Sequence, residues 1–407
     1  MIETALAIAF FSTLITSLVL LILLARRILL PEGVARVEVN ERRTLDAQLG
    51  NKLLDALSAA GIALPSACGG KGTCGQCRID VVGDAPPALP TDAARLDRRE
   101  LAQGTRLACQ LTLRGDLRIR IPDEIFGVRQ WSCRVRSARC VGTMIREIVA
   151  ELPGDERLDF RAGSFVQVTV PPYRARYRDF PIETEVRPEW DRLNLWRHEV
   201  ASSAPVTRAY SLANAPEEDR QATLLVRLAT PPPAAPEDVP PGIASSYLFS
   251  IEAGDSIDLA GPYGHFFASE GDAEMIFVGG GAGMAPLRSH ILHQLGALRT
   301  QRRIGFWYGA RHRRELLYAD LFEGLAAEHP NFHWTPALSE PRPGDAWTGA
   351  VGFIHEVLES SYLAHHSQPE NCEYYLCGPP LMARATCAML ARLGVPPENV
   401  HFDDFGA

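Results

Sequence analysis

The hydrophobic pattern of this chain begins with one long apolar run and then breaks into short ones. No charged residue interrupts the run from Ala5 to Ala25. As a helix rising about 1.5 Å per residue, a run of this length crosses a hydrocarbon core of about 30 Å. We therefore predict a transmembrane anchor over residues 1–30.

The flanks of the run favour an anchor over a cleaved signal peptide. A signal peptide begins with basic residues and has a shorter apolar core. This chain begins Met-Ile-Glu-Thr and leaves the run through Arg26 and Arg27. Because basic residues collect on the cytoplasmic side of membrane helices, we expect a periplasmic N-terminus and a cytoplasmic remainder.

Beyond the anchor, the pattern predicts a first soluble unit over residues 31–127. Apolar residues alternate with polar ones at 37–39, as in a strand, and follow helical spacing at 53–59. Further short strands are expected near 78–82 and 117–121. This unit is therefore expected to be an α+β domain.

The next unit, residues 128–270, is β-rich, with strand-like runs such as 164–170 and 222–228. Between two of its strands lies a long excursion, 171–206, with many Pro, Arg and Trp residues. Loops of that length are usually functional or disordered. Our hypothesis is that this one contacts a partner or the membrane surface.

The last unit, residues 271–407, has an α/β pattern. It opens with the apolar strand 275–278 and a helix from Leu287, and it has later strands at 303–308 and 373–377. Strands that alternate with helices predict an open parallel sheet.

The length of the chain predicts several domains, and its charge limits the partners that it could bind. The 407 residues exceed what one hydrophobic core normally serves. The net charge of −8, with no basic patch, argues against a nucleic-acid partner.

Four of the nine cysteines carry the clearest chemical signal. Three lie in the glycine-rich run 67–77 and the fourth follows far downstream, which is the pattern of a [2Fe–2S] ligand set. Each iron takes two terminal thiolates, and glycines let the loop approach the inorganic sulfides closely. The predicted metal ligands are Cys68, Cys74, Cys77 and Cys109.

Zinc is the alternative, because four cysteines also form a closed tetrahedral zinc site. Zinc ribbons usually pair two Cys-x2-Cys knuckles, whereas here Cys74 and Cys77 form one and Cys109 stands alone. The odd cysteine count and the expected cytoplasmic location disfavour a disulfide framework. The spacing favours iron–sulfur and leaves zinc open.

The turn after the strand 275–278 predicts a dinucleotide site. A strand, a glycine-rich turn and a helix bring backbone amides and the helix dipole to a pyrophosphate. Proline stands where the Rossmann pattern has its third glycine. The predicted binding residues are Gly279, Gly280, Gly281, Gly283 and Pro286.

The first two soluble units resemble known families. The first resembles a ferredoxin with a β-grasp fold, although five residues rather than four separate its first two cysteine ligands. The second carries the motifs Arg208-Ala-Tyr-Ser211 and Gly242-Ile-Ala-Ser-Ser-Tyr247 and resembles the antiparallel flavin barrel of the ferredoxin-reductase family.

The reductase resemblance implies a flavin site. It implies pairing of the flavin pyrophosphate with Arg208, stacking of the isoalloxazine ring on Tyr210, and a hydrogen bond near flavin N5 from Ser211. It also implies a pyrophosphate cap at a helix start, formed by Gly242, Ser245 and Ser246.

The last unit resembles the nicotinamide domain of the same family through Cys377-Gly-Pro-Pro380. The resemblance implies that Cys377, with Gly378 and Pro379, positions the nicotinamide C4. It also implies that an aromatic residue near the C-terminus, Phe405, covers the flavin face. Ser211, Cys377 and Phe405 are thus the residues expected at the reacting atoms.

The residues alone leave the choice of donor open. No acidic residue directly follows the strand 303–308 to hold a ribose 2′-hydroxyl, and Arg311 or Arg313 is placed to accept a 2′-phosphate. Arginines on a solvated helix start explain the same residues equally well.

The order of anchor, ferredoxin, flavin barrel and nicotinamide unit resembles the F subunits of the sodium-translocating NADH:quinone oxidoreductase family. The resemblance implies NADH as donor, FAD as the flavin that passes single electrons to the cluster, and a six-subunit complex of the bacterial inner membrane. Its other subunits would carry electrons to quinone and move sodium. Three alternatives stay open: a membrane-tethered oxygenase reductase, a non-catalytic redox sensor or interaction module, and a zinc-stabilised scaffold.

Overall fold

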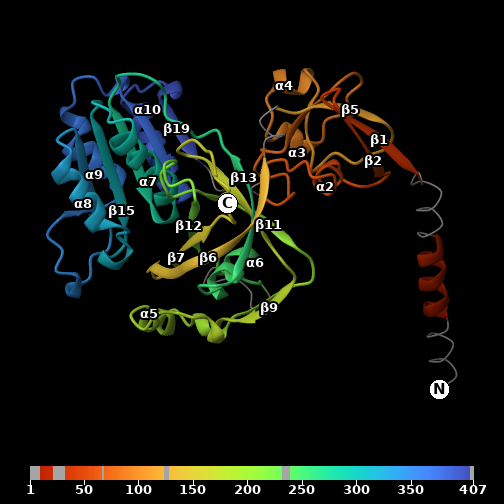
Figure 1. Ribbon diagram of the computed structural model, residues 1–407, viewed down its shortest axis with the longest axis horizontal. Helices are drawn as coiled ribbons and strands as arrows, with labels where there is room; N and C mark the ends of the chain where they lie inside the picture. Colours follow the sequence, from red (N-terminus) through yellow and green to blue (C-terminus); the bar gives the residue numbers. More distant parts are fainter. Residues whose placement is uncertain (1–9, 22–32, 67, 123–127, 232–238, 404–407) are drawn as a thin grey trace. The chain divides into compact units, whose positions relative to one another are not determined.

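The computed structural model describes residues 10–21, 33–66, 68–122, 128–231 and 239–403 (Figure 1). By their internal contacts, the residues divide into two compact units, Met1–Gly127 and Val128–Ala407.

The N-terminal apolar run is only partly described. Residues 10–21 are helical, and the remainder of the predicted span, 5–9 and 22–25, lies outside the described residues. Within the parts of the chain that the structure describes, no helix combines the length and the apolar character needed to cross a membrane.

The first unit is built on a mixed five-stranded sheet in the order β2-β1-β5-β3-β4. The strands β1 and β5 run parallel, and the other neighbours are antiparallel. Leu53 and Leu57 of the helix α2 are fully buried in the same core as the sheet. This is the arrangement expected of a β-grasp domain. Its elements are β1 (Val34–Val39), β2 (Arg43–Gln48), α2 (Leu53–Ala59), β3 (Arg78–Val81), α3 (Pro90–Ala93), α4 (Arg98–Ala102), β4 (Thr105–Leu107) and β5 (Leu117–Arg120).

The second unit begins with an antiparallel barrel in the strand order β11-β8-β13-β6-β7-β12. A bridge between Leu212 and Leu224 and a 2.8 Å hydrogen bond from Ala213 N–H to the Thr223 carbonyl join its two edge strands. The elements are β6 (Arg129–Gly142), β7 (Ile145–Glu151), β8 (Phe165–Val170), β11 (Val206–Ser211), β12 (Gln221–Arg227), α6 (Ile243–Ser250) and β13 (Ser256–Tyr263).

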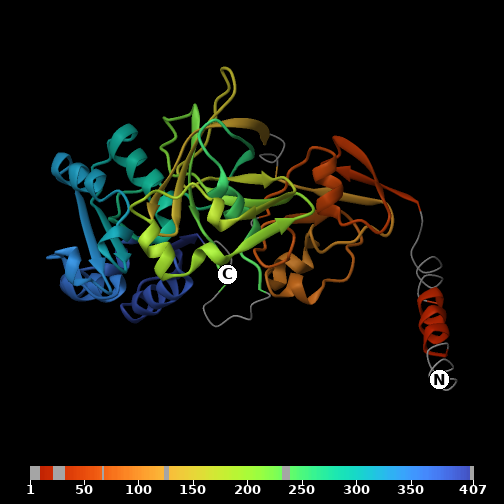
Figure 2. The same ribbon diagram turned by 90° about the horizontal axis from the view of Figure 1, so that it is seen from below.

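The segment 171–205 between β8 and β11, here called the insert, is a folded part of the barrel. Both views place it, in yellow-green, beside α6 (Figures 1 and 2). Trp190 is fully buried in the barrel core and donates its indole N–H to the Thr143 carbonyl at 2.9 Å. The elements are β9 (Tyr173–Arg176), η2 (Tyr177–Asp179), α5 (Arg187–Arg192), η3 (Leu195–Arg197) and β10 (Glu199–Ser202).

The rest of the second unit is a parallel six-stranded sheet in the order β17-β16-β15-β14-β18-β19. The strand β14 is buried along its whole length, as expected for a strand covered on both faces. The strands and main helices are β14 (Met275–Gly280), α7 (Met284–Leu292), β15 (Ile304–Ala310), α8 (Ala319–Glu328), β16 (Phe332–Leu338), β17 (Ala350–Val351), α9 (Ile354–Ser361), β18 (Glu373–Cys377), α10 (Pro380–Arg392) and β19 (Val400–Asp403). The short helices are η4 (Gly281–Gly283), η5 (His293–Ala297), η6 (Arg313–Glu315), η7 (Pro343–Asp345), η8 (Leu363–His365), η9 (Pro369–Asn371) and η10 (Pro397–Asn399).

Alternation along the strands assigns helices to the two faces of this sheet. Met275 and Phe277 of β14 pack with α7 and α8, whereas Ile276 and Val278 pack with α9 and α10. Successive side chains of a strand point to opposite faces, so one apolar strand serves both layers. The predicted open parallel α/β domain is confirmed.

The predicted elements match the structure closely, with two differences. One is that the helix after the glycine turn begins at Met284 rather than at Leu287. The other is that several elements, among them β19, were not predicted. The excursion at 171–206 does lie between two barrel strands.

The burial of Trp190 predicts that the insert stabilises the barrel. Trp190→Ala should lower the free energy of unfolding by about 3–5 kcal/mol, because it opens a cavity and leaves the Thr143 carbonyl without its donor. Hydrogen exchange of the β6 and β7 amides measures this cost. Leu193→Ala is the matched control, since Leu193 is 39% exposed in the same insert. Equal costs for the two variants would contradict a structural role for Trp190.

Candidate functional site

The four predicted metal ligands lie together in two pairs. The Sγ atoms of Cys68 and Cys74 are 3.4 Å apart, and the thiols of Cys77 and Cys109 form the second pair. The first pair is half-buried and the second is buried. Because each iron of a [2Fe–2S] cluster takes two terminal thiolates, two sulfur pairs fit the expected cluster.

The electrostatics of the thiols fit a cation site. Hydrogen bonding within the pairs lowers the pKa of Cys68 to about 3 and that of Cys109 to about 7. The same contacts raise the pKa of the partners, Cys74 and Cys77. Four thiolates in this space repel one another unless cations lie between them, so the donor set suits bound iron.

The loop around these cysteines depends on glycine. Gly69, Gly70, Gly72 and Gly75 all have left-handed φ values, from 63° to 85°, a conformation in which other residues are strained. A Cβ on Gly72 would also lie 2.8 Å from the Gln110 amide nitrogen.

Gln110 is a candidate that motif reasoning missed. Its side-chain amide lies within 3.3 Å of both the Cys109 Sγ and the Gly70 carbonyl. Hydrogen bonds to ligand sulfurs tune the potential of an iron–sulfur cluster. Its position directly after the last cysteine was the available signal.

The barrel strand β11 carries three of the residues predicted to contact flavin. Arg208 and Tyr210 alternate with Ala209, and Ser211 ends the strand. The Ser211 hydroxyl donates to the Asp403 carboxylate at 3.1 Å. Burial raises the pKa of Tyr210. Asp403 was missed because it ends β19, which the hydrophobic pattern did not reveal.

The predicted phosphate turn forms the start of α6. A Cβ on Gly242 would lie 2.7 Å from that of Ala229, so glycine is required by close approach. Both serine hydroxyls bond within the protein: Ser246 donates to the Gly242 carbonyl at 2.7 Å, and Ser245 accepts from the Ala229 N–H at 3.1 Å. An anion here would meet the first N–H groups of the helix. Phosphate binding by the two serines themselves stays a prediction.

The glycine turn and the Cys-Gly-Pro-Pro motif meet at one point. Strand order reverses between β14 and β18, and ligands of open α/β sheets bind at such switch points. A Cβ on Gly283 would lie 2.0 Å from the Cys377 carbonyl oxygen, and one on Gly378 would lie 2.9 Å from that of Gly280. The structure thus brings the two motifs into backbone contact.

Other predicted residues complete this turn. Gly281 has a φ of 57°, and its carbonyl accepts the Tyr308 hydroxyl at 3.1 Å. Pro286 is the third residue of α7, where its fixed φ suits the first turn. Pro379 precedes the first residue of α10. Phe405 lies outside the described residues, so its role stays a prediction.

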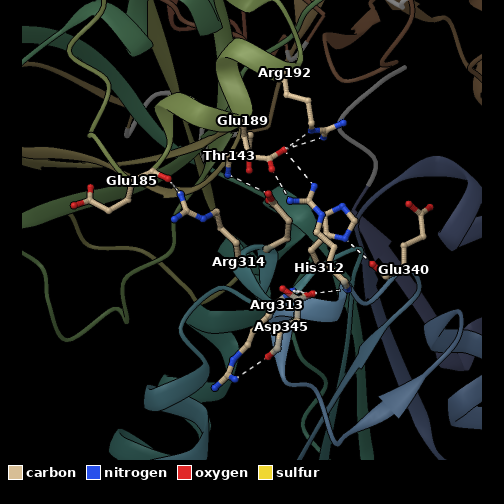
Figure 3. Close-up of polar contacts among 11 residues, drawn as sticks. Thr143, Glu185, Glu189, Arg192, His312, Arg313, Arg314, Glu340 and Asp345 are labelled. Atoms are coloured by element: carbon tan, nitrogen blue, oxygen red, sulfur yellow. Dashed lines mark hydrogen bonds and ion pairs between the residues drawn. The ribbon is translucent and has the colours of Figure 1, made fainter.

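The carboxyl ends of β15 and β16 form the expected ribose end of the dinucleotide site. The Arg313 guanidinium donates to the Asp345 carbonyl at 3.0 Å. The N–H of Glu340 bonds to the Arg311 carbonyl at 3.0 Å, and the His312 Nδ1 lies 2.6 Å from the Glu340 carbonyl (Figure 3). Glu340 therefore brings an exposed carboxylate beside the end of β15. Sequence reasoning missed it because it follows the neighbouring strand.

A second group of possible metal ligands consists of Glu274, His366 and Cys372. A hydrogen bond within the protein already occupies the lone pair with which its histidine would bind a metal. The ligand atoms of the three residues lie within 4.8 Å of one another. However, the His366 Nδ1 accepts the Gln368 N–H at 3.2 Å, so the proton of a neutral ring sits on Nε2. That nitrogen faces the Glu274 carboxylate at 3.2 Å and offers no lone pair to a metal.

Family models match all three soluble parts. The model of a 2Fe-2S iron-sulfur cluster binding domain matches residues 37–114. Those of an oxidoreductase FAD-binding domain and an oxidoreductase NAD-binding domain match 195–267 and 277–388. The first match supports the cluster over zinc.

Relatives match the chain from end to end. It is 48% identical over 406 residues to the F subunit of the Na(+)-translocating NADH-quinone reductase of Methylococcus capsulatus, covering 100% of both chains. It is also 48% identical to the protein of that name in Yersinia pseudotuberculosis, covering 99% of this chain and 100% of the relative. A solved cytochrome P450 reductase from Amycolatopsis is 26% identical with a TM-score of 0.64, covering 91% of this chain and 98% of that one.

The close backbone contact at the switch point predicts that one added methyl group at Gly283 strongly slows flavin reduction. Gly283→Ala should slow the reduction of bound flavin by NADH about 100-fold, because the turn and the Cys377 loop must separate. Stopped-flow absorbance measures this rate. Gly296→Ala is the control, since a Cβ there meets nothing within 4 Å. The assignment fails if both variants react at the wild-type rate.

Proposed function

The chain belongs to the family of Na(+)-translocating NADH-quinone reductase F subunits, and from this premise we propose how its residues move electrons from NADH towards quinone. It is the electron-input subunit: it oxidises NADH and uses FAD and a [2Fe–2S] cluster. The 48% identity over the full chain carries this conclusion, because it covers all three domains at once.

The second unit would carry out the two-electron step, hydride transfer from NADH. When bound, the flavin takes hydride from the nicotinamide and releases single electrons to the cluster. The glycine turn and the start of α7 hold the dinucleotide pyrophosphate, and Cys377, Gly378 and Pro379 bound the nicotinamide pocket. Phe405, which lies outside the described residues, would cover the flavin face.

The barrel residues would fix the flavin. Arg208 pairs with the flavin pyrophosphate beside the start of α6, and the Tyr210 ring stacks on the isoalloxazine. Because burial raises the pKa of Tyr210, its phenol stays protonated. The Asp403 carboxylate accepts a hydrogen bond from the Ser211 hydroxyl and so fixes the direction of the Ser211 lone pairs.

The first unit would carry out the one-electron step, in which the cluster accepts single electrons. The pairs Cys68–Cys74 and Cys77–Cys109 would each hold one iron. The Gln110 amide stabilises the charge on the Cys109 sulfur. A neutral donor at a ligand sulfur favours the reduced cluster, which carries one more negative charge.

A reductase that feeds an oxygenase is the competing function. Its support is the fold similarity to the Amycolatopsis cytochrome P450 reductase. The higher identity to F subunits, 48% against 26%, favours quinone as the destination. Coupling to sodium movement would then belong to the partner subunits of a six-subunit complex.

The uncharged run from Ala5 to Ala25 supports a single-pass anchor in the bacterial inner membrane, with a periplasmic N-terminus. Alkaline carbonate extraction of membranes should leave the full chain in the pellet, whereas a chain lacking residues 1–30 should be washed out. Release of the full chain by carbonate would show that it is peripheral.

Anaerobic titration of the cofactor-loaded full chain tests the electron relay. NADH should bleach the flavin and then the cluster, and NADPH should do so far less well. Cys74→Ala should abolish delivery to a one-electron acceptor and keep the NADH-dependent flavin bleaching, because only the cluster loses a ligand.

Cys387→Ala is the matched control for this titration. Cys387 is a half-buried cysteine of α10, outside both sulfur pairs. Undiminished electron delivery in Cys74→Ala would remove the cluster from the relay. A chain that NADH leaves fully oxidised would refute the proposed function itself.

A further inference from the structure

The insert reaches the ribose end of the dinucleotide site through a charged pair. Arg342, on the loop after β16, binds Glu189 of α5 with both guanidinium Nη atoms, Nη1 to Oε1 and Nη2 to Oε2 at 3.2 Å. Arg192 of the same helix contacts Glu189 Oε2 at 2.8 Å. A two-pronged arginine–carboxylate pair fixes both charge and direction.

Burial and charge make this pair persistent. The Glu189 side chain is 17% exposed and that of Arg342 is 38% exposed. Hydrogen bonding to Arg342 lowers the pKa of Glu189 to about 2, so the carboxylate is ionised across the working pH range. The Trp190 side chain next to it anchors α5 in the barrel core.

The loop that carries Arg342 borders the expected position of the adenosine ribose. Its Glu340 N–H bonds to the Arg311 carbonyl at the end of β15. The Asp345 carboxylate accepts the Arg342 N–H at 2.9 Å and the Arg313 N–H at 3.3 Å. In α/β dinucleotide sites, an arginine in this region accommodates the 2′-phosphate of NADP.

Three of the arginines at this edge are held by protein partners. Arg313 bonds to the Asp345 carbonyl, Arg314 to the backbone carbonyl of Glu185, and Arg342 to Glu189. Two of these partners, Glu185 and Glu189, belong to the insert. The insert thus binds cations that a 2′-phosphate would otherwise attract.

We propose that Glu189 is a positioning residue for donor selection: it holds the Arg342 guanidinium against α5, away from a 2′-phosphate, and so favours NADH over NADPH. The inference rests on the proposed function and extends it, because it assigns part of the nucleotide choice to the insert of the flavin barrel. The exposed Glu340 carboxylate acts in the same direction by repelling the phosphate.

The experiment compares kcat/KM for NADH and NADPH in the full chain loaded with flavin and cluster. Glu189→Gln should raise kcat/KM for NADPH about tenfold, the factor given by one charge-assisted bond of about 1.4 kcal/mol. The gain should lie in KM, with kcat and the NADH values within about twofold of wild type. Glu189→Asp, which keeps the carboxylate, should retain most of the preference for NADH.

Two further variants separate selectivity from stability. Glu189→Gln combined with Arg342→Gln should return NADPH use to the wild-type level, because the released cation is gone. Glu185→Gln is the matched control: it removes the same charge from the same insert, but its side chain is exposed and its backbone carbonyl makes the contact to Arg314. It should leave both donors unchanged.

Each outcome decides the proposal. A tenfold NADPH gain that disappears in the double variant supports it. An equal gain in the single and double variants, or equal losses for both donors, would overturn it. If Glu189→Gln fails to fold, the charge swap E189R/R342E tests the same pair, and loss of NADH preference in the swap would also overturn it. A wild-type chain that oxidises neither donor would overturn the proposed function as well.

Discussion

The proposed nicotinamide pocket of the second unit depends on the close approach of Gly283 to the Cys377 carbonyl, where a Cβ would lie 2.0 Å from the oxygen. This approach joins the loops after β14 and β18. These loops lie at the switch point of the parallel sheet, which is where open α/β sheets bind ligands. β19 pairs with β18 in parallel, with Asp403 beside Cys377. Asp403 in turn reaches Ser211 of the barrel. Sheet register thus brings together groups from three distant segments.

Buried polar contacts hold the barrel against the parallel sheet. The Tyr318 hydroxyl donates to the Glu147 carboxylate of β7, and the Arg288 guanidinium lies 5.0 Å from the centre of the Tyr318 ring. Tyr318 has a left-handed φ of 55°, a strain of about 1–3 kcal/mol for a residue with a side chain. The surrounding contacts must offset that strain. They fix the barrel strand β7 against the start of α8, and the proposed hydride transfer over a short distance requires such a fixed position of the barrel relative to the sheet.

The sequence predicted most of the fold because local patterns determined it. Period-two alternation identified β1, strand-like apolar runs identified β8 and β12, and the apolar spacing of Leu53–Ala59 gave the limits of α2. The cysteine and glycine motifs located residues that do meet in space. The residues that sequence reasoning missed depend on the pairing of distant segments. Asp403 is recognised only once β19 is known to lie beside β18. Glu340 is recognised only once β16 is known to lie beside β15. Neither register can be read from a single segment.

The insert shows why length alone is a poor guide to disorder. A loop of 35 residues is costly to order unless it buries apolar surface, and this one places Trp190 and Tyr177 in the barrel core. At one end the Tyr177 hydroxyl forms a 2.7 Å hydrogen bond with the hydroxyl of Ser246, in the first turn of α6. At the other end Glu189 binds Arg342, which lies on the loop after β16. Because the core between these ends is packed, the insert is a folded connection between α6 and the loop after β16 rather than a linker. The hypothesis that it contacts a partner or the membrane therefore concerns only its outward side chains.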